Sequence, residues 1–192
     1  MTATTHRLTN KTIIVDTGAL MTALLLNFVR MMKASREKQQ KIVNEVVANY
    51  FHNSTRLQSD YLSRFSKEIR PLRTTAHVIA EIHGRARSRL ALHGEDLCSF
   101  WRHSFDFMLG KDLDESLVKL IDLRESNKVV CEIGVIDAAI IHLTHKEGGV
   151  LLSTDHHLMG RAQEQGVAVI SEYEFACGEP IRDRVVAVRK RR

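Results

Sequence analysis

Two short apolar runs, far apart in the sequence, each end at an aspartate, and this repeated pattern constrains the fold most strongly. Ile13-Ile14-Val15 precedes Asp16, and Val150-Leu151-Leu152-Ser153-Thr154 precedes Asp155. Short runs rich in β-branched and aliphatic residues are typical of buried strands in a parallel sheet. If the two strands are neighbours in one parallel sheet, both aspartates lie at the same edge, which is where open α/β sheets bind ligands.

The last third of the chain alternates between strand-like and helix-like segments that are joined by short links. This alternation predicts a parallel sheet with right-handed crossover connections. The expected fold class is therefore α/β, with a central parallel sheet of four to five strands flanked by helices. The predicted strands are 13–15, 72–75, 129–131, 150–154 and 167–170, and the predicted helices are 19–32, 42–51, 57–69, 76–90, 97–110, 113–121, 134–146 and 158–165.

The 192 residues can bury one sizeable core, so we expect a single domain over residues 1–192. The helices between about residues 30 and 70 are expected to form an insertion that protrudes from the sheet. The segment from about 182 to 192 is predicted to be a flexible basic tail. Net charge is +5, with further basic clusters at residues 30–41 and 85–89. This mild excess permits a polyanionic partner without requiring one.

Composition argues against a membrane-spanning or disulfide-built protein. No apolar run reaches the roughly 18 residues that a membrane helix needs, and residues 1–10 lack the apolar middle of a signal peptide. The cysteines Cys98, Cys131 and Cys177 are odd in number and widely spaced, which favours reduced thiols and matches no zinc pattern. We therefore expect a cytoplasmic protein with no membrane partner.

The two aspartates at the strand ends have both a chemical and a structural interpretation. Two carboxylates a few ångströms apart repel, so either one is protonated or a cation lies between them. Alternatively, Asp16 and Asp155 each cap the helix that follows, since aspartate is a favoured N-cap residue.

Two helical carboxylates extend this candidate site. Asp137 lies within the apolar arc of the predicted helix 134–146, and a buried carboxylate needs a partner, either an arginine or a shared metal ion. Glu81 lies on a polar helix face, where pairing with Arg85 at i+4 is the simpler interpretation.

Four short motifs that contain these acids resemble, in the same order, those of the PIN-domain nuclease family. The motifs are residues 13–17 with Asp16, 75–82 with Glu81, 134–140 with Asp137 and 152–158 with Asp155. The final predicted strand fits the same pattern. The chain is longer than many stand-alone members of the family, and its extra helical residues fall mainly between residues 30 and 69.

The resemblance implies a three-layer PIN-like fold and a nuclease site that holds one or two Mg²⁺ or Mn²⁺ ions. It implies that Asp16 is the central metal ligand and that Asp137 and Asp155 are further ligands. Glu81 is then either a ligand or a base that orients water. The chemistry agrees, because Mg²⁺ prefers carboxylate and water oxygens, and a metal pair can activate water for phosphodiester hydrolysis.

By the same resemblance, the hydroxyls of Thr17 and Thr154 would orient the acids or touch phosphate, and the basic clusters would hold an RNA backbone. We therefore expect a metal-dependent endoribonuclease, either the toxin of a toxin–antitoxin pair or a stand-alone enzyme. The expected partners are RNA, an antitoxin or regulatory protein, and a second copy of the chain. Two alternatives are open: a DNA-directed nuclease with the same acid cluster, and a non-catalytic PIN-like module that binds RNA or protein.

Overall fold

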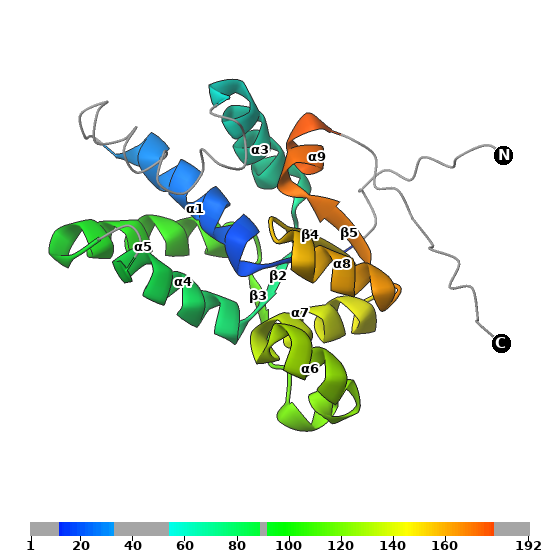
Figure 1. The fold of residues 1–192 in the computed structure, drawn as a ribbon. Helices are drawn as coiled ribbons and strands as arrows, with labels where there is room; N and C mark the ends of the chain where they lie inside the picture. The colour runs from blue at the N-terminus through cyan, green and yellow to red at the C-terminus, as the bar shows by residue number, and fades with distance from the viewer. Residues whose placement is uncertain (1–11, 33–53, 89–91, 179–192) are drawn as a thin grey trace, which may run out of the picture.

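A five-stranded parallel sheet forms the centre of the structure (Figure 1). This computed structural model describes residues 12–32, 54–88 and 92–178. The strands stand in the order β3-β2-β1-β4-β5, and every neighbouring pair is parallel. Their bounds are β1 (Ile13–Val15), β2 (Leu72–Thr75), β3 (Asp114–Ser116), β4 (Val150–Ser153) and β5 (Ala168–Ser171).

The sheet confirms the predicted α/β class and four of the five predicted strands, since β1, β2, β4 and β5 begin and end within one residue of the predicted bounds. The strand predicted at 129–131 is wrong, because these residues belong to helix α6 (Asn127–Ile133). Val129 and Val130 are only partly buried there. Strand preference of β-branched residues depends on packing against neighbours, and helical packing outweighs it in this segment.

The fifth strand is β3, and it lies in the segment that was predicted as a helix over 113–121. This strand forms one edge of the sheet and pairs only with β2, with Asp114 and Glu115 exposed. Charged residues are common on edge strands because they discourage pairing with other chains. The segment therefore lacks the apolar run that identifies a buried strand. The chain continues into a 3₁₀ helix, η2 (Leu120–Ser126).

Helices cover both faces of the sheet (Figure 1). In the described residues the other helices are α1 (Thr17–Met31), α3 (Thr55–Glu68), α4 (Ala76–Ser88), α5 (Gly94–Leu109), α7 (Val135–Lys146), α8 (His156–Glu164) and α9 (Glu172–Cys177). On one face α1 packs against α3, α4 and α5. On the other face α7 packs on β1, β2 and β4 with α6 and η2 beside it, and α8 covers β4 and β5.

Helix α3 belongs to the core and does not protrude from the domain as expected. Tyr61 and Phe65 are fully buried where α3 packs against α1 and α9. The Tyr61 ring lies edge-on to Phe175, with 5.6 Å between the ring centroids. This cover is what the apolar stripe of an amphipathic helix requires. The predicted helix 42–51 and the predicted basic tail lie outside the described residues.

The strand order reverses at β1, because β2 and β3 add on one side of it and β4 and β5 on the other. The crevice outside the carboxyl ends of the strands at such a reversal is the usual place for a ligand site in an open α/β sheet. A single residue, Asp16, separates the end of β1 from the start of α1, and α8 begins shortly after the end of β4. The two strand-end aspartates therefore lie at this reversal point.

Candidate active site

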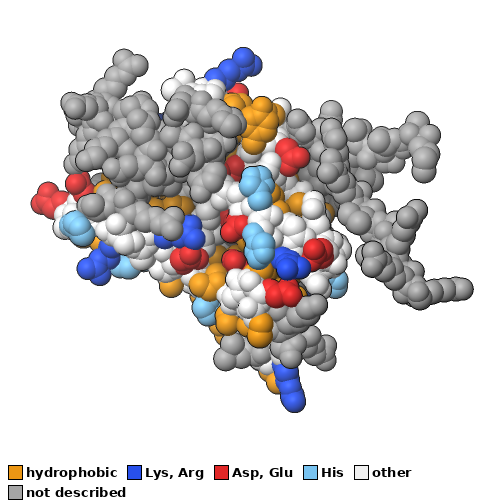
Figure 2. Space-filling view, in the orientation of Figure 1, with side chains coloured by type: hydrophobic (Ala, Val, Ile, Leu, Met, Phe, Trp, Pro, Cys, Tyr) orange, Lys and Arg blue, Asp and Glu red, His pale blue; other side chains and the backbone are white. Residues whose placement is uncertain are grey.

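A pocket of about 610 Å³ lies at the reversal point and is lined by all four predicted acids. Asp16 follows β1, Asp155 follows β4, Glu81 lies on α4 and Asp137 lies on α7. Figure 2 shows acidic side chains beside histidines near the middle of this view. We call this cavity the acid-lined pocket, and it brings together side chains from four separate elements.

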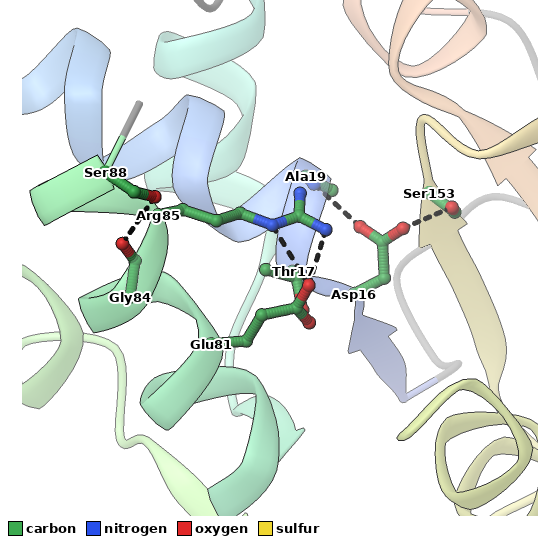
Figure 3. Close-up of polar contacts among 8 residues, drawn as sticks. All are labelled: Asp16, Thr17, Ala19, Glu81, Gly84, Arg85, Ser88 and Ser153. Atoms are coloured by element: carbon green, nitrogen blue, oxygen red, sulfur yellow. Dashed lines mark hydrogen bonds and ion pairs between the residues drawn. The ribbon is translucent and has the colours of Figure 1, made fainter. Parts of the chain in front are cut away.

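Asp16 is the most buried of the four acids, with 4% of its surface exposed. Its Oδ1 accepts a hydrogen bond of 2.7 Å from the backbone N–H of Ala19, so that Asp16 is the N-cap of α1. Its Oδ2 accepts a hydrogen bond from the Ser153 hydroxyl (Figure 3). Burial raises the pKa of Asp16 to about 6, and Asp137 adds to the rise. The two hydrogen bonds and Arg85 oppose this rise by favouring the ionised form.

Glu81 is held by two neighbours (Figure 3). The Thr17 hydroxyl donates to Glu81 Oε2 at 2.6 Å, while Nε and Nη2 of Arg85 donate to Glu81 Oε1 at 3.0 and 2.6 Å. The i+4 ion pair considered from the sequence is therefore present. The predicted proximity of the Thr17 hydroxyl to an acid is also present, although its part in any reaction stays a prediction.

Asp137 lies in the first turn of α7 and is partly buried. Among the described residues, no hydrogen bond or ion pair reaches its carboxylate, so the arginine partner considered from the sequence is not in direct contact with it. Burial raises the pKa of Asp137 to about 6, and the charges of Asp155 and Glu81 raise it further. Arg85 and His157 oppose that rise.

Asp155 is exposed and caps α8. Its Oδ1 accepts hydrogen bonds of 2.8 and 3.0 Å from the backbone N–H groups of His157 and Leu158. The capping interpretation is therefore correct for both strand-end aspartates. Capping uses only Oδ1 of each side chain, so a cap at this position does not prevent the other oxygen from meeting a ligand.

Gly18 allows the start of α1 to approach the end of β4. A Cβ atom on Gly18 would lie 2.2 Å from Thr154 Oγ1, which is far inside van der Waals contact. Thr154 lines the acid-lined pocket, as the resemblance implies, and a second hollow of about 570 Å³ shares Thr154 and His156 with it.

The lining of the acid-lined pocket fits a hard divalent cation in the chemistry of its donors. Mg²⁺ and Mn²⁺ prefer carboxylate oxygens, and a cation would relieve the repulsion that contributes to the raised pKa of Asp137. As the side chains stand, no group of three or more acidic, histidine or cysteine residues in the described part of the chain lies close enough to hold one ion. The Arg85 guanidinium supplies a positive charge that faces these acids.

Two further residues complete the surroundings of Asp16, and the sequence does not single them out. Ser153 stands opposite Asp16 because Val15 pairs with Leu152, so knowledge of the strand register would have predicted this contact. Glu172 is fully buried, and the charge of Asp16 contributes to the rise of its pKa. Its position after β5, at the start of a short capped helix, is more typical of an exposed acid, so no sequence signal indicates its burial.

No protein-family model matches the chain, and no match is found among curated proteins or among solved structures. The structure thus defines the class of the protein as an α/β domain with an acid-lined pocket at the reversal of its strand order. Membership of the PIN-domain family stays a prediction that rests on the four sequence motifs.

Among the described residues, no helix is long and apolar enough to cross a membrane. Cys98, Cys131 and Cys177 are exposed and form no disulfide. The predicted binding of RNA, of an antitoxin or regulatory protein, and of a second copy of the chain stays a prediction.

Proposed function

We propose that this protein is a metal-dependent nuclease that hydrolyses phosphodiester bonds of RNA at the acid-lined pocket. The convergence of Asp16, Glu81, Asp137 and Asp155 on one pocket carries this proposal. Helix caps and i,i+4 ion pairs form anywhere on a protein and do not require such convergence. Four carboxylates at one sheet edge instead create a strongly negative site, which attracts cations.

In this function Asp16, Asp137 and Asp155 hold Mg²⁺ or Mn²⁺, and Glu81 is a further ligand or orients the attacking water. When bound, the metal supplies a more acidic water and stabilises the charge on the leaving oxygen. The raised pKa values of Asp16 and Asp137 support this assignment, because both carboxylates lose the energetic cost of ionisation beside a cation.

The neighbours of the acids would position them for this task. The Ser153 hydroxyl donates to Asp16, and the Thr17 hydroxyl donates to Glu81. Such contacts restrict the rotamers of the acids, and loss of a group that orients a metal ligand typically costs about 10- to 100-fold in metal affinity or activity. Thr154 lines the pocket, and in this function its hydroxyl would contact a substrate phosphate.

The substrate of the proposed reaction is a polyanion, and two basic or titratable side chains line the pocket beside the acids. These are Arg85 and His156. Either RNA or DNA presents the phosphodiester that such groups recognise. The choice of RNA rests on the resemblance of the four motifs, and a DNA-directed nuclease would use the same acids.

A non-catalytic module that binds RNA or protein is the second candidate, and one observation favours it. Glu81 is already satisfied by Arg85 and Thr17, and no three acids in the described residues converge on a point at bonding distance. In this case Asp16 and Asp155 serve the fold as helix caps and Glu81 as a member of an ion pair.

The deciding experiment compares the wild-type protein with Asp16→Asn and Asp137→Asn on end-labelled single-stranded RNA and DNA. We expect cleavage of RNA with Mn²⁺ or Mg²⁺ and none after addition of EDTA. Each variant should cleave more slowly by about 100-fold or more, since even the groups that surround metal ligands contribute about 10- to 100-fold.

Asp112→Asn is the matched control. Asp112 is an exposed aspartate that pairs with Arg70 and does not line the pocket, so this variant should cleave like the wild-type protein. If RNA binds but stays intact, and if Asp16→Asn binds RNA as well as the wild type, the non-catalytic module replaces our proposal. Equal cleavage by all variants would show that the acids do not carry the activity.

A further inference from the structure

Arg85 places a guanidinium group inside the acid-lined pocket. Its Nε and Nη2 both bond to Glu81 Oε1, and about a third of each of these two side chains is exposed. Figure 3 shows the guanidinium directed into the same space as the Asp16 carboxylate. Arg85 itself lines the pocket together with all four acids.

The charge of Arg85 acts on more than its partner in the ion pair. It favours the ionised forms of both Asp16 and Asp137 and so lowers the pKa values that burial raises. A second i,i+4 pair, Arg64 with Glu68 on α3, bonds through both glutamate oxygens and does not line the pocket, whereas both bonds of Arg85 go to Oε1 of Glu81. Arg85 is therefore distinguished by its location among the four acids.

The ion pair of Arg85 with Glu81 also explains why Glu81 does not lie close to the other acids. Arg85 holds one oxygen of Glu81, and the Thr17 hydroxyl holds the other. With both oxygens engaged, Glu81 does not join the other acids in a three-residue cluster, and no such cluster occurs among the described residues. Release of Arg85 would free Oε1 of Glu81 to face the pocket.

We propose that Arg85 is an exchangeable counter-ion, which pairs with Glu81 in the absence of a divalent ion and moves to a substrate phosphate when the carboxylates bind one. This inference rests on the proposed function. An arginine suits both positions, because its planar guanidinium bonds to carboxylate and to phosphate in the same two-pronged geometry. A lysine ammonium would supply the charge without this geometry.

If Arg85 exchanges in this way, its removal should strengthen the binding of Mn²⁺ and weaken the binding of RNA. Arg85→Met keeps the length and apolar stem of the side chain but removes its charge. Mn²⁺ should then bind about three- to tenfold more tightly, since the ion no longer competes with an internal cation. A phosphorothioate RNA that resists cleavage should bind about tenfold more weakly in the presence of Mn²⁺, since the phosphate loses its guanidinium contact.

Two further variants distinguish the effect of the charge of Arg85 from the effect of its geometry and from a loss of folding. Arg85→Lys keeps the charge, so Mn²⁺ affinity should stay within about threefold of wild type while RNA affinity falls. Arg64→Met removes the comparable pair outside the pocket and should alter neither affinity. Titration calorimetry gives the Mn²⁺ affinity, fluorescence anisotropy gives the RNA affinity, and circular dichroism confirms that each variant is folded.

The outcomes distinguish this inference from the proposed function. If the wild type binds Mn²⁺ and folded Arg85→Met binds it no more tightly, Arg85 is a fixed structural partner and the inference fails while the nuclease proposal stands. If only Arg85→Met binds Mn²⁺, the inference is supported in its strongest form. If neither protein binds Mn²⁺, with or without the RNA, both proposals fail together.

Discussion

At the scale of single residues, the least expected group is the buried carboxyl of Glu172. It is 2% exposed, and neither of its oxygens has a hydrogen-bond partner within the described residues. The hydroxyls of Thr22 and Tyr61 donate to the backbone carbonyls of Gly18 and Ala19, and both hydroxyls also act on Glu172 in the direction that lowers its pKa. Burial raises the pKa of Glu172 well above its ordinary range, and Asp16 adds to this rise.

Glu172→Gln should therefore stabilise the fold at pH 7.5 and have little effect at pH 4. The unfolded glutamate ionises at its usual pKa of about 4.3, while burial raises the pKa of the folded group, so the wild type loses stability as pH rises above the unfolded value. Glutamine does not ionise, so the variant should not lose this free energy of unfolding, which we expect to be on the order of 1–3 kcal/mol. Urea denaturation of both proteins at the two pH values measures the effect, and an equal gain at both would contradict it.

At the scale of elements, the two junctions that lead from β1 into α1 and from β4 into α8 build the site. Each junction supplies an aspartate that caps its helix and also lines the pocket. The junctions lie against each other because Gly18 leaves room for the Thr154 side chain. Their close approach, and not the presence of the acids alone, determines the spacing of Asp16 and Asp155.

Gly18→Ala should disturb this approach. The added methyl group would overlap Thr154 Oγ1, and such overpacking destabilises proteins by about 1–3 kcal/mol. Gly84→Ala on α4 is the matched control, because nothing lies within 4 Å of its added Cβ. That control should be stabilised by about 0.5–1 kcal/mol, as expected for alanine in place of glycine within a helix. Thermal unfolding of the two variants should shift in opposite directions, and a shared direction would count against this account of Gly18.

The elements also show which features a sequence can predict. Strands β1 and β4 are buried along their whole length, so their apolar runs identify them, whereas β3 is an exposed edge with no apolar pattern. The contact of Glu81 with Arg85 follows from helical spacing. The contacts of Asp16 with Ser153 and of Gly18 with Thr154 depend on how two distant strands pair, and residue patterns alone do not specify a register.

At the scale of the whole molecule, the acid-lined pocket links stability to pH and to cations. Asp16 and Asp137 each have a pKa of about 6, above the usual value for aspartate. Both groups therefore contribute stability that is fully present below pH 4 and is lost as pH rises through about 6. A divalent ion that binds the ionised carboxylates would restore stability above this range.

Mn²⁺ should therefore raise the melting temperature more at pH 7.5 than at pH 5, because protons compete for the same oxygens. At a concentration about 100 times its dissociation constant, a bound ion contributes about 2.7 kcal/mol, which for a domain of this size corresponds to a shift of several degrees. Differential scanning fluorimetry at both pH values measures the shift. Asp16→Asn should show almost none, and a shift of equal size in that variant would place the Mn²⁺ elsewhere.

The pairing of β1 with β4 also has a consequence for biosynthesis. Asp16 and Ser153, which are joined by a hydrogen bond, are 137 positions apart in the sequence. A growing polypeptide that carries β1, β2 and β3 still lacks the strand that completes the pocket, and contacts of such long range form late in folding. Most of the chain therefore leaves the ribosome before the four carboxylates meet. A nascent protein with the proposed activity thus has no assembled hydrolytic centre while it is beside ribosomal RNA.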